Sequence, residues 1–518
     1  MCEGRVLIFL GLVFLAGLTC AADSETVPLE TLEVRVRLAS AKTIEIRSGA
    51  PVTVRSAKGS KELPAGVYVV DAASVTPPGR RYHLFIKTFR PSQGVEAREY
   101  MKQWKAQAYS PEVVMFGKKF SSGSNVVIDN RRQWISVGRF DTEKQAEAMK
   151  TQLEAQKVFG WIMPETVGQG AATMRIASGG NIVAQGAGPL TFRSSEPLEV
   201  AGIDRGFWNP HHVTMSFAGT LEAGPGVDGL LNLTEVVPVE QYLEGVLPAE
   251  MPASWPTEAL KAQAVAARTE VLSALGGKHM LEGYDFCATE HCRSYGACAG
   301  RQGSTDEAVA GTRGEVLIRG GRFAATVFSA NCGGRSENNE AVWSAPADET
   351  LRSVSDVKTG KKVSSWREVG VEKWLKRPPA SYCDHRNENF RWTRRFSAGE
   401  LSGIVNKKCR VGQVKRIELL ERGPGGRLTA VKIVGTGGTE VVKKELNIRL
   451  AFGGLPSAMF MVETRGPGRS SDFTFIGGGR GHGVGMCQDG ACGMAAAGKT
   501  GYEILRHYFS NVDITRLH

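Results

Sequence analysis

A single carboxylate, Glu250, stands between two prolines in the segment Val246-Leu-Pro-Ala-Glu-Met-Pro252. Pro248 and Pro252 each disfavour helical geometry in the residue before them, so we expect Glu250 to lie on a stiff, non-helical corner. A rigid corner suits a lone acid that transfers a proton. The alternative is that Glu250 caps the helix predicted over residues 256–275, because a helix start favours negative charge. Position alone favours the cap, because acids are common in the first turn of a helix.

A loop further along the chain concentrates side chains that bind soft metal ions. It contains two histidines and three cysteines: His279, Cys287, His291, Cys292 and Cys298. Zinc prefers imidazole and thiolate ligands in tetrahedral sets, and close spacing lowers the entropic cost of gathering them. The CxxC spacing of zinc ribbons is absent. A disulfide of Cys292 with Cys287 or with Cys298 is the alternative to a zinc site.

Two glycine-rich turns crowded with polar groups are candidate linings of a cleft. They are Phe328-Ser-Ala-Asn-Cys-Gly-Gly-Arg-Ser-Glu337 and Gly477-Gly-Gly-Arg-Gly-His-Gly-Val-Gly-Met-Cys-Gln488. The second exposes backbone N–H groups around His482 and lacks the dinucleotide pattern G-x-G-x-x-G. Gly493-Met-Ala-Ala-Ala-Gly-Lys-Thr500 matches a phosphate-loop pattern, but no apolar strand precedes it, and we expect a helix that ends at Gly498. We therefore expect no bound nucleotide.

Strand and helix patterns predict a protein of the α+β class. Short alternating strands fill residues 24–76. Residues 80–165 follow the order strand, helix, strands, helix, strand, with Asp141 expected to cap the second helix, which is typical of a split βαβ unit of ferredoxin-like type. Strand patterns resume at residue 172, and a glycine pair at 320–321 predicts a hairpin.

Charge and the N-terminal residues indicate an exported protein with an anionic partner. The net charge of +11 favours nucleic acid, a membrane surface or an acidic polysaccharide. Dispersed lysines and arginines, with no basic-aromatic motif, argue against nucleic acid. Residues 1–22 contain an apolar run too short for an ordinary membrane span, followed by Thr19-Cys-Ala-Ala22, which predicts a signal peptide, with a lipoprotein or a membrane anchor as alternatives. Each places the chain in the periplasm or cell envelope, where its other eight cysteines could form disulfides.

The split βαβ unit over residues 80–165 resembles the SPOR family of peptidoglycan-binding modules. The likeness is carried by Trp134-Ile-Ser-Val-Gly-Arg-Phe-Asp-Thr-Glu-Lys-Gln-Ala146. It implies binding to glycan strands stripped of their stem peptides. The alternative is a generic ferredoxin-like regulatory domain, because that fold serves many functions.

Five motifs in the remaining chain, taken in order, resemble the SpoIID/LytB family of peptidoglycan-acting proteins. They are residues 237–252, residues 260–269, the pair Cys287 and Cys292, residues 332–337 and residues 481–488. The resemblance spans residues 172–515 and implies a SpoIID-like mixed α/β catalytic domain. Residues 24–76 are then the first strands of that domain, and the SPOR-like unit is an insertion.

This resemblance implies a lytic transglycosylase that cleaves denuded glycan strands, with Glu250 as the catalytic acid. It also implies a structural zinc bound by Cys287, Cys292 and His279, with His291 as the rival histidine. Substrate contacts are implied for Gln263, Arg268, Ser329, Ser336, His482 and Gln488. The rival function is a non-catalytic enhancer that recruits a cell-wall amidase.

The sequence departs from the family pattern at two places. Arg293-Ser294 stands where Gln-Val usually precedes Tyr295, and Glu349-Thr350 replaces an aromatic residue before Leu351. The second departure puts one cleft contact in doubt.

Overall fold

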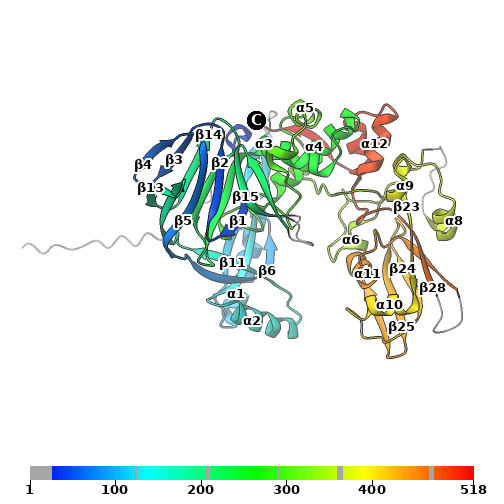
Figure 1. Cartoon of the computed structure of the whole chain (residues 1–518). Helices are drawn as coiled ribbons and strands as arrows, with labels where there is room; N and C mark the ends of the chain where they lie inside the picture. Colours follow the sequence, from blue (N-terminus) through cyan, green and yellow to red (C-terminus); the bar gives the residue numbers. More distant parts are fainter. Residues whose placement is uncertain (1–25, 123–126, 206–210, 290, 359–365, 466–471) are drawn as a thin grey trace, which may run out of the picture.

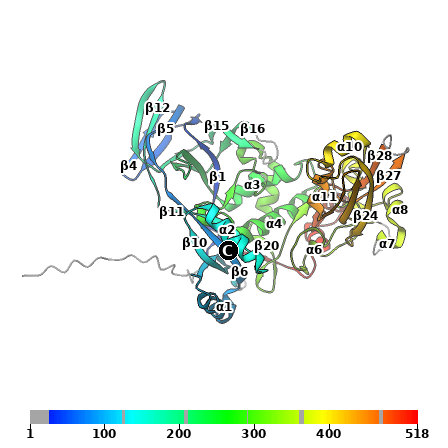
Figure 2. The ribbon, with the colours of Figure 1, turned by 90° about the horizontal axis from the view of Figure 1, so that it is seen from below.

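The computed structural model describes residues 26–122, 127–205, 211–289, 291–358, 366–465 and 472–518. The segment expected to be a signal peptide, residues 1–22, lies outside the described residues. Figures 1 and 2 show an N-terminal β domain, a small inserted unit, a central helical body and a C-terminal lobe. Helices and strands both contribute to the core, in agreement with the α+β prediction. None of the described helices is long and apolar enough to span a membrane.

Two sheets build the N-terminal β domain. The larger has the order β19-β1-β18-β17-β14-β3-β4 and the smaller β13-β12-β5-β2-β15-β16. Their strands are β1 (Glu33–Ala41), β2 (Ile44–Ser48), β3 (Val52–Ser56), β4 (Gly59–Leu63), β5 (Gly66–Thr76), β12 (Ala171–Ser178), β13 (Asn181–Ala187), β14 (Leu190–Ser194), β15 (Leu198–Arg205), β16 (His211–Phe217), β17 (Thr220–Pro225), β18 (Leu231–Pro238) and β19 (Phe286–Cys287). Alternate residues of β1, namely Val34, Val36 and Leu38, are buried, as a strand with one face on the core requires.

The inserted unit leaves and re-enters this domain at one place, because β5 and β12 pair with Ala171 opposite Thr76. It comprises β6 (Gly79–Phe89), η2 (Pro91–Gln93), α1 (Gly94–Ala106), β7 (Glu112–Phe116), β8 (Lys119–Ser121), β9 (Val127–Asp129), β10 (Arg132–Phe140), α2 (Glu143–Ala155) and β11 (Trp161–Val167). The sheet order β11-β6-β10-β7 is that of a split βαβ unit. Its membership of the SPOR family stays a prediction.

The start of α2 corrects one expected cap. Thr142, not Asp141, is the N-cap: its hydroxyl accepts from the backbone N–H of Gln145 at 3.3 Å. The Gln145 side chain in turn accepts from the backbone N–H of Thr142 at 3.0 Å. This reciprocal pair satisfies two helix-start donors, which a lone Asp141 one residue earlier would not do.

One edge of the inserted unit docks on the central body. The N–H of Gly117 donates to the Gly276 carbonyl at 2.9 Å, and the Asn130 side-chain amide donates to the Ser273 carbonyl at 2.6 Å. Leu281 packs with Phe85 and other apolar residues of the sheet. The unit is therefore fixed against the segment that leads into the cysteine-rich loop.

The central body surrounds α4 (Thr257–Ala274). Alanines such as Ala262, Ala266 and Ala267 are fully buried, which lets neighbouring helices pack closely. The other elements are η1 (Leu29–Thr31), α3 (Val239–Glu250), η3 (Met280–Glu282), η4 (Ala297–Gly300), α5 (Gly303–Gly311), β20 (Glu315–Arg319), β21 (Arg322–Phe323), α12 (Gln488–Ala496), α13 (Gly501–Tyr508) and β30 (Asp513–Arg516). The hairpin predicted at residues 320–321 is confirmed, with φ of +55° and +70° at the two glycines.

The C-terminal lobe is a second insertion, and its two ends meet. It begins after β22 (Phe328–Ser329) and ends at β29 (Met486–Cys487), and these two strands pair in parallel. Between them lie α6 (Asn339–Val342), α7 (Trp366–Val369), α8 (Val371–Lys376), η5 (Tyr382–Asp384), α9 (Asn387–Phe390), β23 (Arg391–Ser397), α10 (Ala398–Val405), β24 (Val414–Arg422), β25 (Leu428–Gly435), β26 (Thr439–Lys443), α11 (Glu445–Ala451), β27 (Phe460–Arg465) and β28 (Asp472–Gly478). The lobe has its own aromatic core around Phe452, Phe460 and Phe475.

Candidate functional site

Glu250 is the last residue of α3, and this corrects the expected non-helical corner. The helix continues through Pro248, and the N–H of Met251 still donates to the Leu247 carbonyl at 2.9 Å. A proline inside a helix costs about 3 kcal/mol. Burial of neighbouring apolar side chains, Val246 and Leu247 among them, opposes this cost and keeps the helix intact. Glu250 does not cap α4 either, since the N-cap of α4 is Pro256.

The environment of Glu250 favours a protonated carboxyl group. The residue is half-buried, and burial raises the pKa of Glu250 to about 7. The nearby Glu270 raises this pKa further, whereas Arg293 and a hydrogen bond from Gln488 lower it. The Gln488 side chain also donates to the Glu250 backbone carbonyl at 3.0 Å, which ties the start of α12 to the end of α3. Glu250 can therefore hold a proton near neutral pH.

Glu270 and Arg293 form an ion pair beside Glu250. Arg293 is only 9% exposed, and its Nη1 lies 3.5 Å from Oε2 of Glu270. Its guanidinium carbon lies 4.7 Å from the centre of the Phe286 ring, a cation–π contact. Burial raises the pKa of Glu270 and Arg293 opposes that rise. Reasoning from the sequence identifies Arg293 only as a departure from the family pattern, and it does not identify Glu270 as a site residue.

Several buried polar atoms of α3, α4 and the cysteine-rich loop form no hydrogen bond within the described residues. The side-chain amide of Gln263, the hydroxyl of Tyr242 and the Nε and Nη1 atoms of Arg293 make no hydrogen bond to any described residue. Gln263 lies two helical turns before Glu270 on α4, so both face the same side of that helix. Buried polar atoms without partners are costly, so enclosed water is expected beside them. Gln263 and Tyr242 are 0% exposed and cannot touch a glycan, which corrects the substrate contact expected of Gln263.

A second buried glutamate with a raised pKa serves the fold instead. Burial raises the pKa of Glu235 to about 7 as well. Its two carboxyl oxygens accept hydrogen bonds from the Tyr295 hydroxyl at 2.8 Å and the Gly219 N–H at 3.1 Å, and it is 1% exposed. A substrate cannot reach a carboxyl enclosed in this way. Glu250 is half-buried, so a substrate can approach it in a way that it cannot approach Glu235.

The cysteine-rich loop brings together four potential metal ligands, which we call the loop cluster: His279, Cys287, His291 and Cys292. Their ligand atoms all lie within 4.8 Å of one another. The sulfur of Cys287 lies 3.3 Å from that of Cys292 and 3.4 Å from Nδ1 of His291. The two histidines that the sequence presented as rivals are thus both present. Cys298 lies outside the cluster, and none of the eight cysteines in the described part of the chain forms a disulfide.

The loop cluster fits a structural zinc ion. Nδ1 of His279 forms a hydrogen bond with Oε1 of Glu282 at 2.7 Å. The buried Nε2 of His279 forms no hydrogen bond with any described residue. An outer carboxylate that orients a histidine ring is usual at zinc sites. Two thiolates and two imidazoles complete a tetrahedral set. Cys287 lies on β19, which pairs with β1, so the cluster is anchored to the large sheet, and Arg293 directly follows Cys292.

Arg268 belongs to the fold and not to a substrate cleft, which corrects its expected role. Its side chain is completely buried, and Nε and Nη2 each lie 2.8 Å from an oxygen of Glu240. The guanidinium also donates to the Val309 carbonyl at 3.1 Å and the Glu315 carbonyl at 3.2 Å. Every one of these partners is part of the protein interior, so no donor remains for a glycan.

The two glycine-rich turns lie side by side at the root of the lobe. The N–H of Gly483 donates to the Ser329 hydroxyl at 3.1 Å. Half-buried His482 packs on Trp343 with ring centres 5.0 Å apart, and burial lowers the pKa of His482 to about 4, so it is neutral at pH 7. Gln488 begins α12 next to these turns. The structure thus groups Ser329 and His482 near the segment that carries Gln488.

Ser336 is placed differently from the other expected contacts. It is fully buried, and its hydroxyl accepts from the Val354 N–H at 2.7 Å. Its backbone N–H donates to the Val354 carbonyl at 2.9 Å. We therefore assign Ser336 to holding the lobe root together, in place of the substrate contact that the sequence predicted.

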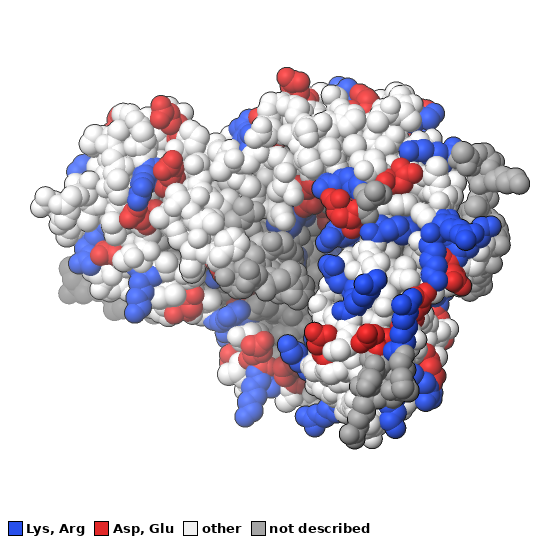
Figure 3. Space-filling view, turned by 45° about the vertical axis from the view of Figure 1, so that its right-hand side comes forward, with Lys and Arg blue, Asp and Glu red and all other residues white. Residues whose placement is uncertain are grey.

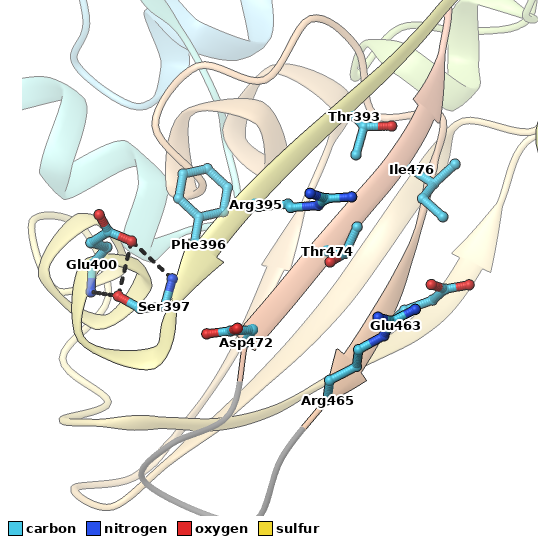
Figure 4. A pocket seen from close by; sticks show the side chains of 10 residues that line it. All are labelled: Thr393, Arg395, Phe396, Ser397, Glu400, Glu463, Arg465, Asp472, Thr474 and Ile476. Carbon is cyan, nitrogen blue, oxygen red and sulfur yellow. Dashed lines mark hydrogen bonds between the residues drawn. The ribbon is translucent and has the colours of Figure 1, made fainter.

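A hollow of about 570 Å³ lies elsewhere, on the sheet β23-β28-β27 of the lobe. Figure 4 shows its charged lining, which includes Arg395, Glu463, Arg465 and Asp472, beside the reciprocal hydrogen bonds of Ser397 and Glu400 that start α10. None of its described lining residues belongs to the Glu250 site or to the loop cluster. Its volume alone therefore does not make it the catalytic site.

Two models of known protein families match different parts of the chain. A family model described as SpoIID, Stage II sporulation protein, matches residues 228–318, which include Glu250, Glu270, Arg293 and the loop cluster. A model of a domain of unknown function (DUF8618) matches residues 337–485, which cover most of the lobe.

Related proteins extend these matches over more than half of the chain. An uncharacterized protein of Brachyspira hyodysenteriae is 30% identical over 301 residues, covering 58% of this chain and 72% of that protein. Stage II sporulation protein D of Bacillus subtilis is 28% identical over 295 residues, covering 54% of this chain and 75% of that protein. The amidase enhancer of the same organism is 27% identical over 301 residues, covering 53% of this chain and 40% of that protein.

Proposed function

The chain belongs to the SpoIID/LytB family, and from this membership we propose that it is a peptidoglycan lytic transglycosylase with Glu250 as the catalytic group. The observation that carries the proposal is the half-buried carboxyl group of Glu250, whose pKa burial raises to about 7, inside the segment that matches the SpoIID model. Proton transfer by a positioned side chain is most effective when its pKa lies near the working pH.

The proposed reaction needs one carboxyl group acting twice. Protonated Glu250 donates its proton to the oxygen of the bond between N-acetylmuramic acid and N-acetylglucosamine, and that bond breaks. The Glu250 carboxylate then accepts the proton of the sixth-carbon hydroxyl, whose oxygen closes on the anomeric carbon. The products are an anhydro sugar and a free chain end, no water is consumed, and Glu250 regains its proton. Ordinary glycosidases instead use a pair of carboxyl groups.

Neighbouring groups support this role in different ways. Neutral His482 and Ser329 lie on the turns beside α12 and would contact a longer strand. Lysine and arginine side chains crowd the right-hand half of the face in Figure 3, which suits the lactyl carboxylates of denuded glycan. We also propose that the chain works outside the cytoplasm, where this substrate lies.

The pH dependence of cleavage is expected to shift when the Glu270–Arg293 ion pair beside Glu250 is broken. Activity requires protonated Glu250, so it falls as pH rises through a pKa of about 7. Glu270→Gln removes a nearby negative charge that raises this pKa and leaves Arg293, which lowers it. The falling limb of the pH–rate profile should therefore move to lower pH, by about one unit. Product release from denuded sacculi, measured from pH 5 to 9 by mass spectrometry, tests this shift.

Glu307→Gln is the control for this shift, because Glu307 is exposed on α5 and should leave the profile in place. An unmoved limb in the Glu270→Gln protein, or a limb displaced to higher pH, would contradict the assignment of Glu250 as the titrating acid.

We further propose that the loop cluster binds zinc. His279, Cys287, His291 and Cys292 would hold the ion, which would supply no chemistry to the substrate but would fix the loop that carries Arg293. Cys292→Ser should remove one zinc per chain and lower activity, because Arg293 then loses its anchor. Elemental analysis of the purified protein gives the metal content. Cys298→Ser, in the same loop but outside the cluster, should change neither the zinc content nor the activity. Equal zinc contents in the Cys292→Ser and Cys298→Ser proteins would refute the site.

A further inference from the structure

Four buried side chains from distant parts of the sequence meet at the root of the C-terminal lobe. They are Cys332, Asp356, Cys383 and Cys487, and we call them the root cluster. Their ligand atoms all lie within 4.8 Å of one another, and each residue is at most 1% exposed. None of these four residues belongs to the loop cluster or to the Glu250 site.

The separations within the root cluster suit a metal ion better than a disulfide. The sulfurs of Cys332 and Cys383 are 3.7 Å apart. Zinc bonds of about 2.3 Å to sulfur place two tetrahedral sulfur ligands about 3.8 Å apart, whereas a disulfide requires about 2.05 Å. The Cys332 sulfur lies 3.1 Å from Oδ2 of Asp356. Three cysteines also cannot all pair with one another, so one thiol would remain in any disulfide arrangement.

Outer contacts hold the carboxylate and one thiol in place. Oδ1 of Asp356 accepts from the Tyr508 hydroxyl at 2.8 Å and lies 3.2 Å from Nε2 of His507, which leaves Oδ2 facing the thiols. The Cys487 sulfur accepts from the Cys332 N–H at 3.1 Å and from the Gly490 N–H at 3.3 Å. Hydrogen bonds of this kind orient the ligands of metal sites and stabilise their charged forms.

Backbone geometry at the cluster is equally constrained. A Cβ at Gly490 would collide with Oδ2 of Asp356 and with the Tyr508 hydroxyl, so only glycine allows this approach. The side-chain amide of Asn331 donates to the Cys383 carbonyl at 2.9 Å and to Asp489 at 2.9 Å, which ties together the three segments that carry the cysteines.

We propose that Cys332, Asp356, Cys383 and Cys487 bind a structural zinc ion that fastens the root of the C-terminal lobe to α12. Zinc takes three thiolates and a carboxylate oxygen as a closed tetrahedral set. Complete burial leaves no open position for a substrate, so the ion acts on the fold. Softer thiolate ligands also favour zinc over calcium or magnesium.

The position of this ion connects it to the Glu250 site. Cys487 immediately precedes Gln488, whose side chain donates to the Glu250 backbone carbonyl at 3.0 Å. Cys332 follows the strand that carries Ser329, and the strands of Ser329 and Cys487 pair in parallel. The root zinc therefore positions both glycine-rich turns. This inference does not depend on the loop cluster or on glycan cleavage.

Metal analysis of variants of the full chain tests the root cluster separately from the loop cluster. In Cys287→Ser/Cys292→Ser the loop cluster is destroyed and the root cluster is untouched. This protein is expected to retain one zinc per chain. After exchange with Co²⁺ alone, it should show tetrahedral visible bands and strong thiolate-to-cobalt absorption. Adding Cys487→Ser should take the metal from one equivalent to none, while serine still caps α12 by accepting from the Gly490 N–H.

Cys409→Ser added to the same background is the matched control, because Cys409 is a buried cysteine of the lobe outside both clusters. The protein with Cys409→Ser in this background should retain one zinc per chain. The proposal is overturned if folded Cys287→Ser/Cys292→Ser protein binds neither Zn²⁺ nor Co²⁺. It is equally overturned if non-reducing peptide mapping finds Cys332 and Cys383 linked, with the loss of two hydrogens. Neither result needs the Cys487 variant to fold.

Discussion

Glu250→Gln should abolish the release of anhydro-muramic products from denuded sacculi, lowering kcat by about 10² to 10⁴-fold. Glutamine keeps the size of the side chain but neither donates a proton to the glycosidic oxygen nor accepts one from the sixth-carbon hydroxyl. Substrate binding should change little, since the groups proposed to contact the strand, such as Ser329 and His482, remain. The measurement is a time course of soluble products resolved by mass spectrometry.

Glu244→Gln is the matched control on the same helix. Glu244 is half-buried on α3 and pairs with Arg301 at 2.7 Å, so its loss perturbs a comparable carboxyl group without touching the proposed acid. It should keep most of the activity. The Glu250 variant should be at least as stable as the wild type at pH 8, because the ionised form of a group with a raised folded pKa opposes folding there.

The same comparison decides between cleavage and the amidase-enhancer alternative. Equal product release by the wild type and Glu250→Gln would end the transglycosylase proposal. If neither protein releases products but both stimulate a cell-wall amidase, the chain is an enhancer, as the name of one Bacillus subtilis relative suggests. Cleavage that only the wild type performs, with amidase stimulation unchanged, supports the enzyme.

The sequence predicted elements well where local chemistry decides the conformation. The long helix α4 and the Gly320-Gly321 hairpin are present, because apolar periodicity and positive φ are properties of short segments. Glu250 shows the limit of this reasoning. Two prolines suggested a corner, but the packing of α3 against the rest of the body kept the helix continuous to Glu250.

Long-range partners could not be read from spacing. Glu270 and Arg293 meet only because the cysteine-rich loop folds back on α4, and no local pattern records that contact. The root cluster draws ligands from positions 332, 356, 383 and 487, which lie on four separate segments. The loop cluster, whose four ligands span residues 279–292, was short enough for composition to reveal it, although not to choose between its histidines.

The contact between the inserted unit and the central body also could not be predicted from the sequence. Trp134 and Trp161 line a hollow of about 340 Å³ that is closed on one side by residues 273–278 at the end of α4. A glycan bound by the unit in the SPOR manner, which we retain as a proposal, would therefore have to share this face with the central body. This arrangement places any such glycan contact next to the cysteine-rich loop.

Arg268→Met is expected to destabilise the central body by about 3–5 kcal/mol, because it leaves Glu240 buried without its counter-ion. Both carboxyl oxygens of Glu240 depend on this guanidinium, and Glu240 otherwise accepts only the Gly314 N–H at 3.2 Å among the contacts found in the described residues. The denaturant midpoint should fall accordingly. At a temperature where the variant is still folded, KM for denuded glycan should equal that of the wild type, because Arg268 does not reach the cleft.

Two further proteins separate the buried charge from a general loss of an arginine. Arg175→Ala breaks a surface ion pair with Asp71, whose N–O distance is 2.8 Å, and should cost no more than about 1 kcal/mol. Arg268→Met/Glu240→Leu should recover much of the stability lost in the single variant, since no charge is then left unpaired in the interior. An Arg268→Met protein with an unchanged midpoint and a raised KM would return Arg268 to the substrate cleft, where its family resemblance first placed it.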